Sequence, residues 1–230
     1  MTAPTERTHV LLDLDGTLSD SEPGILRSLQ WAFQQEGFPI PTEAQVRSVI
    51  GPPFEIGLPS IGIPDDALER VINTYRDRYT RLGAFENTLY DGIIEMLDAL
   101  AALGFSLSIA TAKPEQTAHP ILDYFGISER FDVRAGATLT SERRTKAQVI
   151  DHALRELEIH SDPDLGDHVI MVGDRDHDVH GAMHHGIACI GVTWGYGSVT
   201  ELLSAGAVAL ADSPGEVVEL VQQPYRLLNS

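Results

Sequence analysis

The chain has 230 residues, of which 43% are apolar, and this length allows either one large domain or one domain that carries an insertion. Its 34 acidic and 16 basic residues give a formal net charge of −18, which disfavours binding to nucleic acid polymers and to anionic membranes. The sequence contains no run of about 20 apolar residues and no apolar signal segment near its start, so we expect a cytoplasmic protein.

The first predicted strand lies in residues 10–16, an apolar run that ends in two carboxylates and a glycine. Asp13 and Asp15 are two positions apart, so their side chains would share one face if the strand continued. One carboxylate could attack phosphorus, while the other would donate a proton to the departing alkoxide and later activate water. A solvated Asp-rich turn is the alternative, which the preceding apolar strand and Gly16 disfavour.

A helical segment follows this strand. Apolar periodicity predicts helices over residues 22–35 and 65–81, on either side of a loop that contains Gly51 and Pro52. Because this region breaks the strand pattern, we predict that residues 19–85 form an inserted α-helical cap domain.

Strands alternate with helices in the rest of the chain. Further strands are predicted over 106–111, 168–174 and 188–193, and helices over 92–103 and 146–157. This alternation predicts βαβ units and therefore an α/β fold with a doubly wound, Rossmann-like parallel sheet, whose ligands bind beyond the carboxyl ends of the strands. We assign this core to residues 1–18 and 86–230.

Two of these later strands also end in polar residues. Asp174 follows one of them, and a hard Mg²⁺ ion prefers carboxylate oxygens together with water and phosphate oxygens. The alternative is that Asp174 caps the next helix and Asp178 interacts with the positive end of its dipole. Thr111 ends another strand, where its hydroxyl and the next backbone N–H groups could bind phosphate at a helix start. Lys146, near the start of a helix, could neutralise phosphate oxygens and restrain the nucleophile.

Several histidines gather between positions 177 and 185. His180 and His184 would share a helix face at a spacing that can bind Zn²⁺ or Ni²⁺. We favour solvent-exposed histidines here, because no third well-spaced ligand is evident and the oxygen-rich site suits Mg²⁺ better.

Taken in order, the motifs resemble those of the haloacid dehalogenase-like hydrolase superfamily. The resemblance rests on Asp13-x-Asp15-Gly-Thr-Leu, Thr111 after an apolar strand, Lys146, and Gly173-Asp174-x-x-x-Asp178. It covers essentially the whole chain and implies a Rossmann-like core with a helical cap inserted after the first motif, as in phosphoglycolate phosphatase-like members. The second acid, Asp15, favours phosphate transfer over dehalogenation, because a carbon–halogen bond needs no proton on its leaving group.

The resemblance also implies roles for individual residues. Asp13 would be the nucleophile, Asp15 the general acid and base, and Thr111 and Lys146 the phosphate binders. The Mg²⁺ ligands would be Asp13, the Asp15 carbonyl and Asp174, with Asp178 supporting the metal or Lys146, and Mn²⁺ is an alternative ion. The charged triplet that follows Asp174, residues 175–177, departs from the smaller or polar residues expected there.

Finer features are similar to the phosphoglycolate phosphatase-like and 5′-nucleotidase-like branches. In that resemblance the substrate would contact Gly51 and Pro52 in the cap and Thr111, Ala112, Lys113 and Lys146 in the core. We therefore expect Mg²⁺-dependent hydrolysis of a small phosphate monoester through an aspartyl phosphate, with a small phosphorylated metabolite as the binding partner. The alternatives are a sugar phosphomutase and a catalytically silent protein that binds a phosphate ligand.

Overall fold

The computed structural model describes residues 8–50, 54–139, 142–160 and 165–223. The chain divides into two units, of which the first contains Met1–Leu18 and Leu89–Ser230 and the second contains Ser19–Thr88. Two short strands, β2 (Ser19–Asp20) and β3 (Thr88–Leu89), pair where the chain passes between the units. The second unit is therefore an insertion into the first.

The first unit is built on a six-stranded sheet whose strands run in the order β5-β4-β1-β6-β7-β8, with every neighbouring pair parallel. The strands are β1 (His9–Leu12), β4 (Ser106–Pro114), β5 (Val133–Ala137), β6 (Val169–Gly173), β7 (Ala188–Val192) and β8 (Ala209–Ala211). This parallel sheet with flanking helices confirms the predicted Rossmann-like α/β class. Because all strands point the same way, their carboxyl ends meet at one edge.

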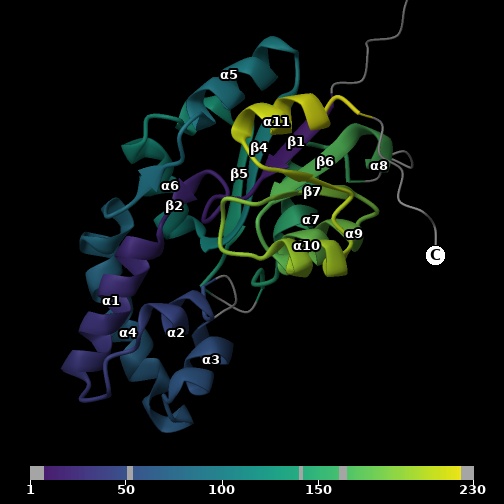
Figure 1. Cartoon of the computed structure of the whole chain (residues 1–230). Helices are drawn as coiled ribbons and strands as arrows, with labels where there is room; N and C mark the ends of the chain where they lie inside the picture. The colour runs from purple at the N-terminus through teal and green to yellow at the C-terminus, as the bar shows by residue number, and fades with distance from the viewer. Residues whose placement is uncertain (1–7, 51–53, 140–141, 161–164, 224–230) are drawn as a thin grey trace, which may run out of the picture. The chain divides into compact units, whose positions relative to one another are not determined.

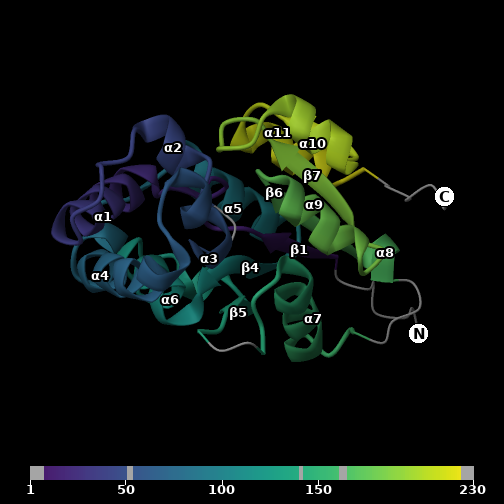
Figure 2. The same ribbon diagram turned by 90° about the horizontal axis from the view of Figure 1, so that it is seen from below.

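Helices cover both faces of this sheet (Figures 1 and 2). On one face lie α7, α9 and α10, while α5 and α11 contact each other on the other face. The helices of this unit are α5 (Ile93–Ala102), α6 (Glu115–Tyr124), α7 (Lys146–Glu156), α8 (Leu165–His168), α9 (Asp176–Met183), α10 (Val199–Ala205) and α11 (Pro214–Leu220), with the 3₁₀ turn η4 (Ser128–Arg130). The strands are therefore buried on both sides, and Val10, Leu11 and Leu12 are fully inaccessible to solvent.

The edge strands β5 and β8 were not predicted from the sequence. Their residues, Val-Arg-Ala-Gly-Ala and Ala-Leu-Ala, are short and contain few large apolar side chains. They pair with β4 and β7, so their strand conformation comes from the neighbouring strand.

The second unit is helical. Its two long helices, α1 (Glu22–Gln35) and α4 (Leu68–Arg81), pack against each other and bury Leu29, Phe33 and Val71. The remaining elements are α2 (Glu43–Arg47), α3 (Phe54–Gly57), η1 (Leu58–Ile61), η2 (Asp65–Ala67) and η3 (Gly83–Phe85).

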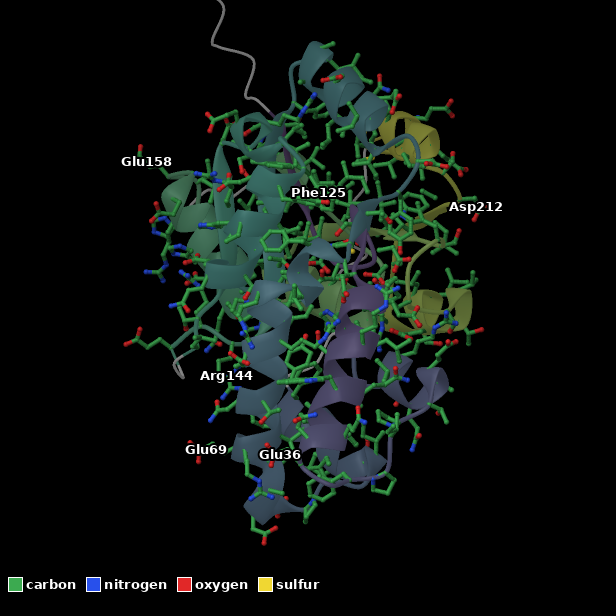
Figure 3. The ribbon with its side chains drawn as sticks, turned by 90° about the vertical axis from the view of Figure 1, so that its left-hand side faces the viewer. Glu36, Glu69, Phe125, Arg144, Glu158 and Asp212 are labelled. Carbon is green, nitrogen blue, oxygen red and sulfur yellow. The ribbon has the colours of Figure 1, made fainter. Side chains whose placement is uncertain are left out.

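Polar contacts tie the two long helices together in the second unit. Arg78 of α4 donates to both carboxylate oxygens of Glu86, at 2.9 and 3.0 Å, and to the hydroxyl of Ser28 on α1. Glu36, labelled in Figure 3, accepts a 2.6 Å hydrogen bond from the Thr74 hydroxyl. Both long helices have 14 residues, and within the described ranges no helix has the length and apolarity needed to cross a membrane.

Candidate active site

Charged side chains gather at the carboxyl ends of β1, β4 and β6 in the first unit. Asp13 directly follows β1, and its N–H donates to the Val172 carbonyl of β6 at 3.0 Å. Asp174 directly follows β6, and Thr111 lies within β4. The parallel register brings these sequence-distant positions to one edge, as expected for this fold class.

Lys146 connects the groups at this edge. It occupies the first turn of α7, which begins with a reciprocal capping interaction between Thr145 and Gln148. The Lys146 ammonium lies 2.8 Å from Asp13 Oδ1 and 2.6 Å from Asp178 Oδ1, and it donates to the Ala110 carbonyl at 2.8 Å. Its side chain is only 1% exposed, so the ion pairs are screened little by solvent.

Negative charge exceeds positive charge in this buried cluster. Asp13, Asp174 and Asp178 are buried around the Lys146 ammonium, and the other buried ammonium at this edge, that of Lys113, pairs with Asp15. Burial and the nearby Asp178 raise the pKa of Asp13, although Lys146 opposes the shift. Burial, Asp178 and Asp13 raise the pKa of Asp174 well above its usual range. Burial also acts to raise the pKa of Asp178, but Lys146 and His177 outweigh it and lower that pKa.

Asp174 is held by uncharged donors. Its Oδ2 accepts a 2.7 Å hydrogen bond from the Tyr196 N–H, and its Oδ1 accepts a longer one, 3.4 Å, from the Thr17 hydroxyl. Gly16 lies against the same carboxylate with a φ of 80°, and a side chain at that position would collide with Asp174. The turn after β1 can therefore approach Asp174 only because residue 16 is glycine.

Asp15 is paired with Lys113 across the strand ends. Lys113 Nζ donates to Asp15 Oδ2 at 2.6 Å, and the Lys113 side chain is only 6% exposed. Asp15 Oδ1 is buried and has no hydrogen-bond partner among the described residues. The Lys113 N–H donates to the Thr111 hydroxyl at 3.2 Å, beside a register shift between β4 and β5. Thr111, Ala112 and Lys113 therefore belong to the end of β4 rather than to the start of α6.

The charges of this cluster suit a divalent cation. A buried group with three carboxylates and one ammonium is relieved by added positive charge, and carboxylate oxygens are ligands that Mg²⁺ prefers. Asp13, His177 and Asp178 also offer ligand atoms that lie within 4.8 Å of one another. Two of those three residues already pair with Lys146, whereas Asp174 accepts only neutral hydrogen bonds from the partners described above. Asp174 therefore carries a carboxylate that no cation pairs with among these partners, and its charge is the one that a bound cation would offset most directly.

His177 lies near the site, although no role there was predicted for it from the sequence. Its side chain is 25% exposed, and its Nε2 lies 3.9 Å from Asp178 Oδ1. The expectation of solvent-exposed histidines was therefore wrong for His177, and also for His185, which is half-buried and lies 2.8 Å from the Ala147 carbonyl. The expectation held for His180 and His184, which are exposed. The signal was present in the sequence, because residue 177 directly precedes Asp178.

Of the remaining predicted positions, Asp178 lies at the site, and the two cap residues are not described by the structure. Asp178 contacts Lys146 and also accepts from the Arg175 N–H at 3.0 Å at the start of α9. The N-cap of this helix is Arg175, so the alternative in which Asp174 caps it was wrong. Arg175 itself pairs with Glu201 at 2.7 Å. Gly51 and Pro52 lie outside the described residues.

Comparison with known proteins identifies similar chains. The model of the family described as haloacid dehalogenase-like hydrolase matches residues 10–192. The tyrosine-protein kinase PtkA of Mycobacterium tuberculosis is 42% identical over 188 residues, which are 82% of this chain and 62% of PtkA. The 5′-nucleotidase of Pseudomonas aeruginosa is 38% identical over 195 residues, covering 84% of this chain and 86% of that enzyme.

Solved structures give the same picture of the fold. The crystal structure of a predicted phosphatase from Clostridium acetobutylicum is 34% identical, has a TM-score of 0.86, and covers 95% of this chain and 99% of that one. The likeness therefore extends over both units, whereas this chain spans less than two thirds of the length of PtkA.

Proposed function

This chain belongs to the haloacid dehalogenase-like hydrolase family, and on that basis we propose that it is a Mg²⁺-dependent phosphatase that hydrolyses a small phosphate monoester through an aspartyl phosphate on Asp13. The observation that carries the proposal is the buried Asp13 carboxylate, which meets the Lys146 ammonium at 2.8 Å beside the end of a central strand. A carboxylate restrained by a cation, with a second carboxylate two residues away, is suited to attack phosphorus.

In the first step, a carboxylate oxygen of Asp13 forms a bond to phosphorus while the bond between phosphorus and the ester oxygen breaks. Asp15 donates a proton to the departing alkoxide. Lys146 and Lys113 offset the charge of the phosphoryl oxygens, and the Thr111 hydroxyl orients them. When bound to Asp13, the Asp15 carbonyl and Asp174, Mg²⁺ would supply further positive charge at these oxygens.

In the second step, Asp15 accepts a proton from water, and the water oxygen bonds to phosphorus. The bond between phosphorus and Asp13 breaks, which releases inorganic phosphate and restores both carboxyl groups to their starting protonation states. Asp178 keeps Lys146 next to Asp13 throughout, because the ammonium bridges the two carboxylates.

A nucleoside 5′-monophosphate is the substrate class that we favour. The support is the 38% identity to a 5′-nucleotidase over most of both chains. Phosphoglycolate is the second choice, because the sequence motifs resemble that branch of the family as well. A sugar phosphomutase would use the same two carboxylates but return the phosphoryl group to an organic acceptor.

Phosphoryl transfer to a tyrosine hydroxyl is a second candidate function, which the 42% identity to PtkA favours. In that reaction the phenolic oxygen would take the place of water in the second step, and the Asp13–phosphorus bond would break in the same way. The kinase reaction would take its phosphoryl group from a nucleoside triphosphate, release the diphosphate and form a tyrosine phosphate, so the donor and the product both distinguish the two functions.

The test is phosphate release from nucleoside 5′-monophosphates, phosphoglycolate, sugar phosphates and pyrophosphate. We expect one monoester class to release phosphate when Mg²⁺ is present. This release should stop when EDTA is added and recover when Mg²⁺ or Mn²⁺ is added in excess. Incubation with labelled ATP and tyrosine-containing peptides in parallel would reveal a kinase. No phosphate release from any monoester, or release that EDTA does not change, would overturn the proposal.

Lys113→Met is expected to raise KM more than it lowers kcat. Loss of one charge-assisted hydrogen bond to phosphate costs about 1.5–3 kcal/mol, which corresponds to about a 10- to 100-fold weaker interaction. Lys113→Arg, which keeps the charge, should retain more of the affinity. Steady-state kinetics on the preferred monoester would measure both, and an unchanged KM in Lys113→Met would remove Lys113 from the phosphate-binding set.

A further inference from the structure

The loop between β7 and α10 lies directly against Asp174, and none of the roles assigned so far accounts for this contact. Asp174 accepts its 2.7 Å hydrogen bond from the Tyr196 N–H of this loop. At Gly195, an added Cβ would collide with the Asp174 side chain and with the Gly16 carbonyl. The backbone of the loop therefore lies directly against the carboxylate, and a side chain at position 195 would move one of them.

Contacts at both ends fix the loop. Before it, the Thr193 N–H donates to the Ala211 carbonyl of β8 at 3.0 Å, and the Thr193 hydroxyl donates to Asp212 at 2.6 Å. After it, the Ser198 hydroxyl accepts from the Glu201 N–H at 3.1 Å and caps α10. The loop is therefore anchored at one end to β8 and at the other end to α10, and these anchors fix the part of it that contacts Asp174.

Two further contacts connect the same segment to both sides of Asp174. The Trp194 indole N–H donates to the Thr17 carbonyl at 3.0 Å, and the Thr17 hydroxyl contacts Asp174. Glu201 accepts from the Asp176 N–H at 3.1 Å and pairs with Arg175, the residue after Asp174. The segment from Trp194 to Glu201 thus holds Asp174 through its carboxylate and through the residues that follow it.

We propose that the Trp194–Gly197 loop is a positioning element that fixes the Asp174 carboxylate in the orientation needed to bind the divalent cation. The inference rests on the proposed metal-dependent function. The loop donates the Tyr196 N–H to Oδ2 of Asp174. Its Trp194 side chain also holds Thr17, whose hydroxyl is the donor to Oδ1. With both oxygens held, the carboxylate keeps its orientation when the ion leaves. The affinity for metal is therefore set partly by residues that do not touch the ion.

The experiment measures Mn²⁺ binding directly, by electron paramagnetic resonance titration of the full chain. Gly195→Ala should weaken Mn²⁺ binding by about 10- to 100-fold, the usual cost of losing an outer partner of a metal ligand. Gly215→Ala is the matched control, because a Cβ there meets nothing closer than 4.0 Å, and it should bind as the wild type does. Turnover of Gly195→Ala should recover at high Mg²⁺, which a general loss of structure would prevent.

Trp194→Phe keeps an aromatic ring and removes the N–H donor. It therefore tests the positioning role of the loop if Gly195→Ala does not fold. It should bind Mn²⁺ about 10-fold more weakly than the wild type. Folded variants that bind Mn²⁺ within about twofold of the wild type would overturn the positioning role. Asp174→Asn separates the two proposals: if it binds Mn²⁺ as well as the wild type, the metal site itself is wrong.

Discussion

Asp13→Asn should reduce phosphatase turnover by on the order of 10⁴-fold or more, the scale of loss seen when a member of a catalytic set is removed. The amide is a poor nucleophile toward phosphorus, although it has nearly the shape of the carboxylate. The substitution also removes one of the two carboxylates that face Lys146, so we expect the protein to fold with Lys146 paired to Asp178 alone. Turnover with the preferred monoester and circular dichroism would measure activity and folding separately.

Asp15→Asn is the matched comparison for that experiment. It keeps the nucleophile and removes the proton donor, so an activated ester such as p-nitrophenyl phosphate should still phosphorylate Asp13. Because the same side chain activates water, the phosphorylated protein should accumulate and be detected by mass spectrometry. Turnover of Asp13→Asn within about 100-fold of the wild type, or a phosphoryl group on another residue in Asp15→Asn, would contradict the assignment of the nucleophile.

Lys146→Met should destabilise the first unit by about 3–5 kcal/mol, the usual cost of removing one partner of a buried ion pair. Burial alone lowers the pKa of Lys146, but Asp13 and Asp178 outweigh it and raise that pKa above its ordinary value. The ammonium form of Lys146 is therefore fully present at neutral pH, and its stabilising contribution falls as the pH rises through the alkaline range. Urea unfolding at neutral pH, followed by tryptophan fluorescence, would measure the loss.

A surface pair on the same helix provides the control. Arg155 and Asp151 of α7 form an ion pair at 2.9 Å, and their side chains are 61% and 43% exposed. Arg155→Met should change the free energy of unfolding by less than about 1 kcal/mol, because exposed pairs are solvated and screened. The loss in Lys146→Met should also shrink as the pH falls, since protonation of Asp13 or Asp178 removes the repulsion between them. Equal effects of the two substitutions would contradict the buried bridge.

A long helix of the second unit and the central strand of the first unit could be predicted from sequence, whereas the edge strands of the first unit could not. The helix expected over residues 22–35 is α1 with the same bounds, because its apolar positions repeat regularly and Pro23 lies in its first turn. The central strand β1 is a continuous apolar run, which is typical of a strand buried on both faces. In contrast, β8 consists of Ala209–Ala211, and only its pairing with β7 makes it a strand.

The candidate site divides in a similar way. Motif order predicted which acids lie at strand ends, and the sheet brings Asp13 next to Lys146 at ion-pair distance. The Lys113–Asp15 pair and the approach of Tyr196 to Asp174 were not predicted, because they depend on how two loops from different strands meet. Such contacts leave no spacing pattern in a single sequence. The role of each residue remains a prediction until the variants are measured.

The strand order has a consequence for how the protein is made. Among the six strands of this sheet, β1 comes first along the chain, yet it lies inside the sheet between β4 (Ser106–Pro114) and β6 (Val169–Gly173). Asp13 is therefore synthesised before the entire helical unit and most of the core, and its contacts with the Lys146–Asp178 pair can form only after those residues have been made. A truncated chain that ends before β6 cannot assemble this constellation. The proposed phosphatase activity should therefore be absent from a nascent chain in which β6 and α9 have not yet formed.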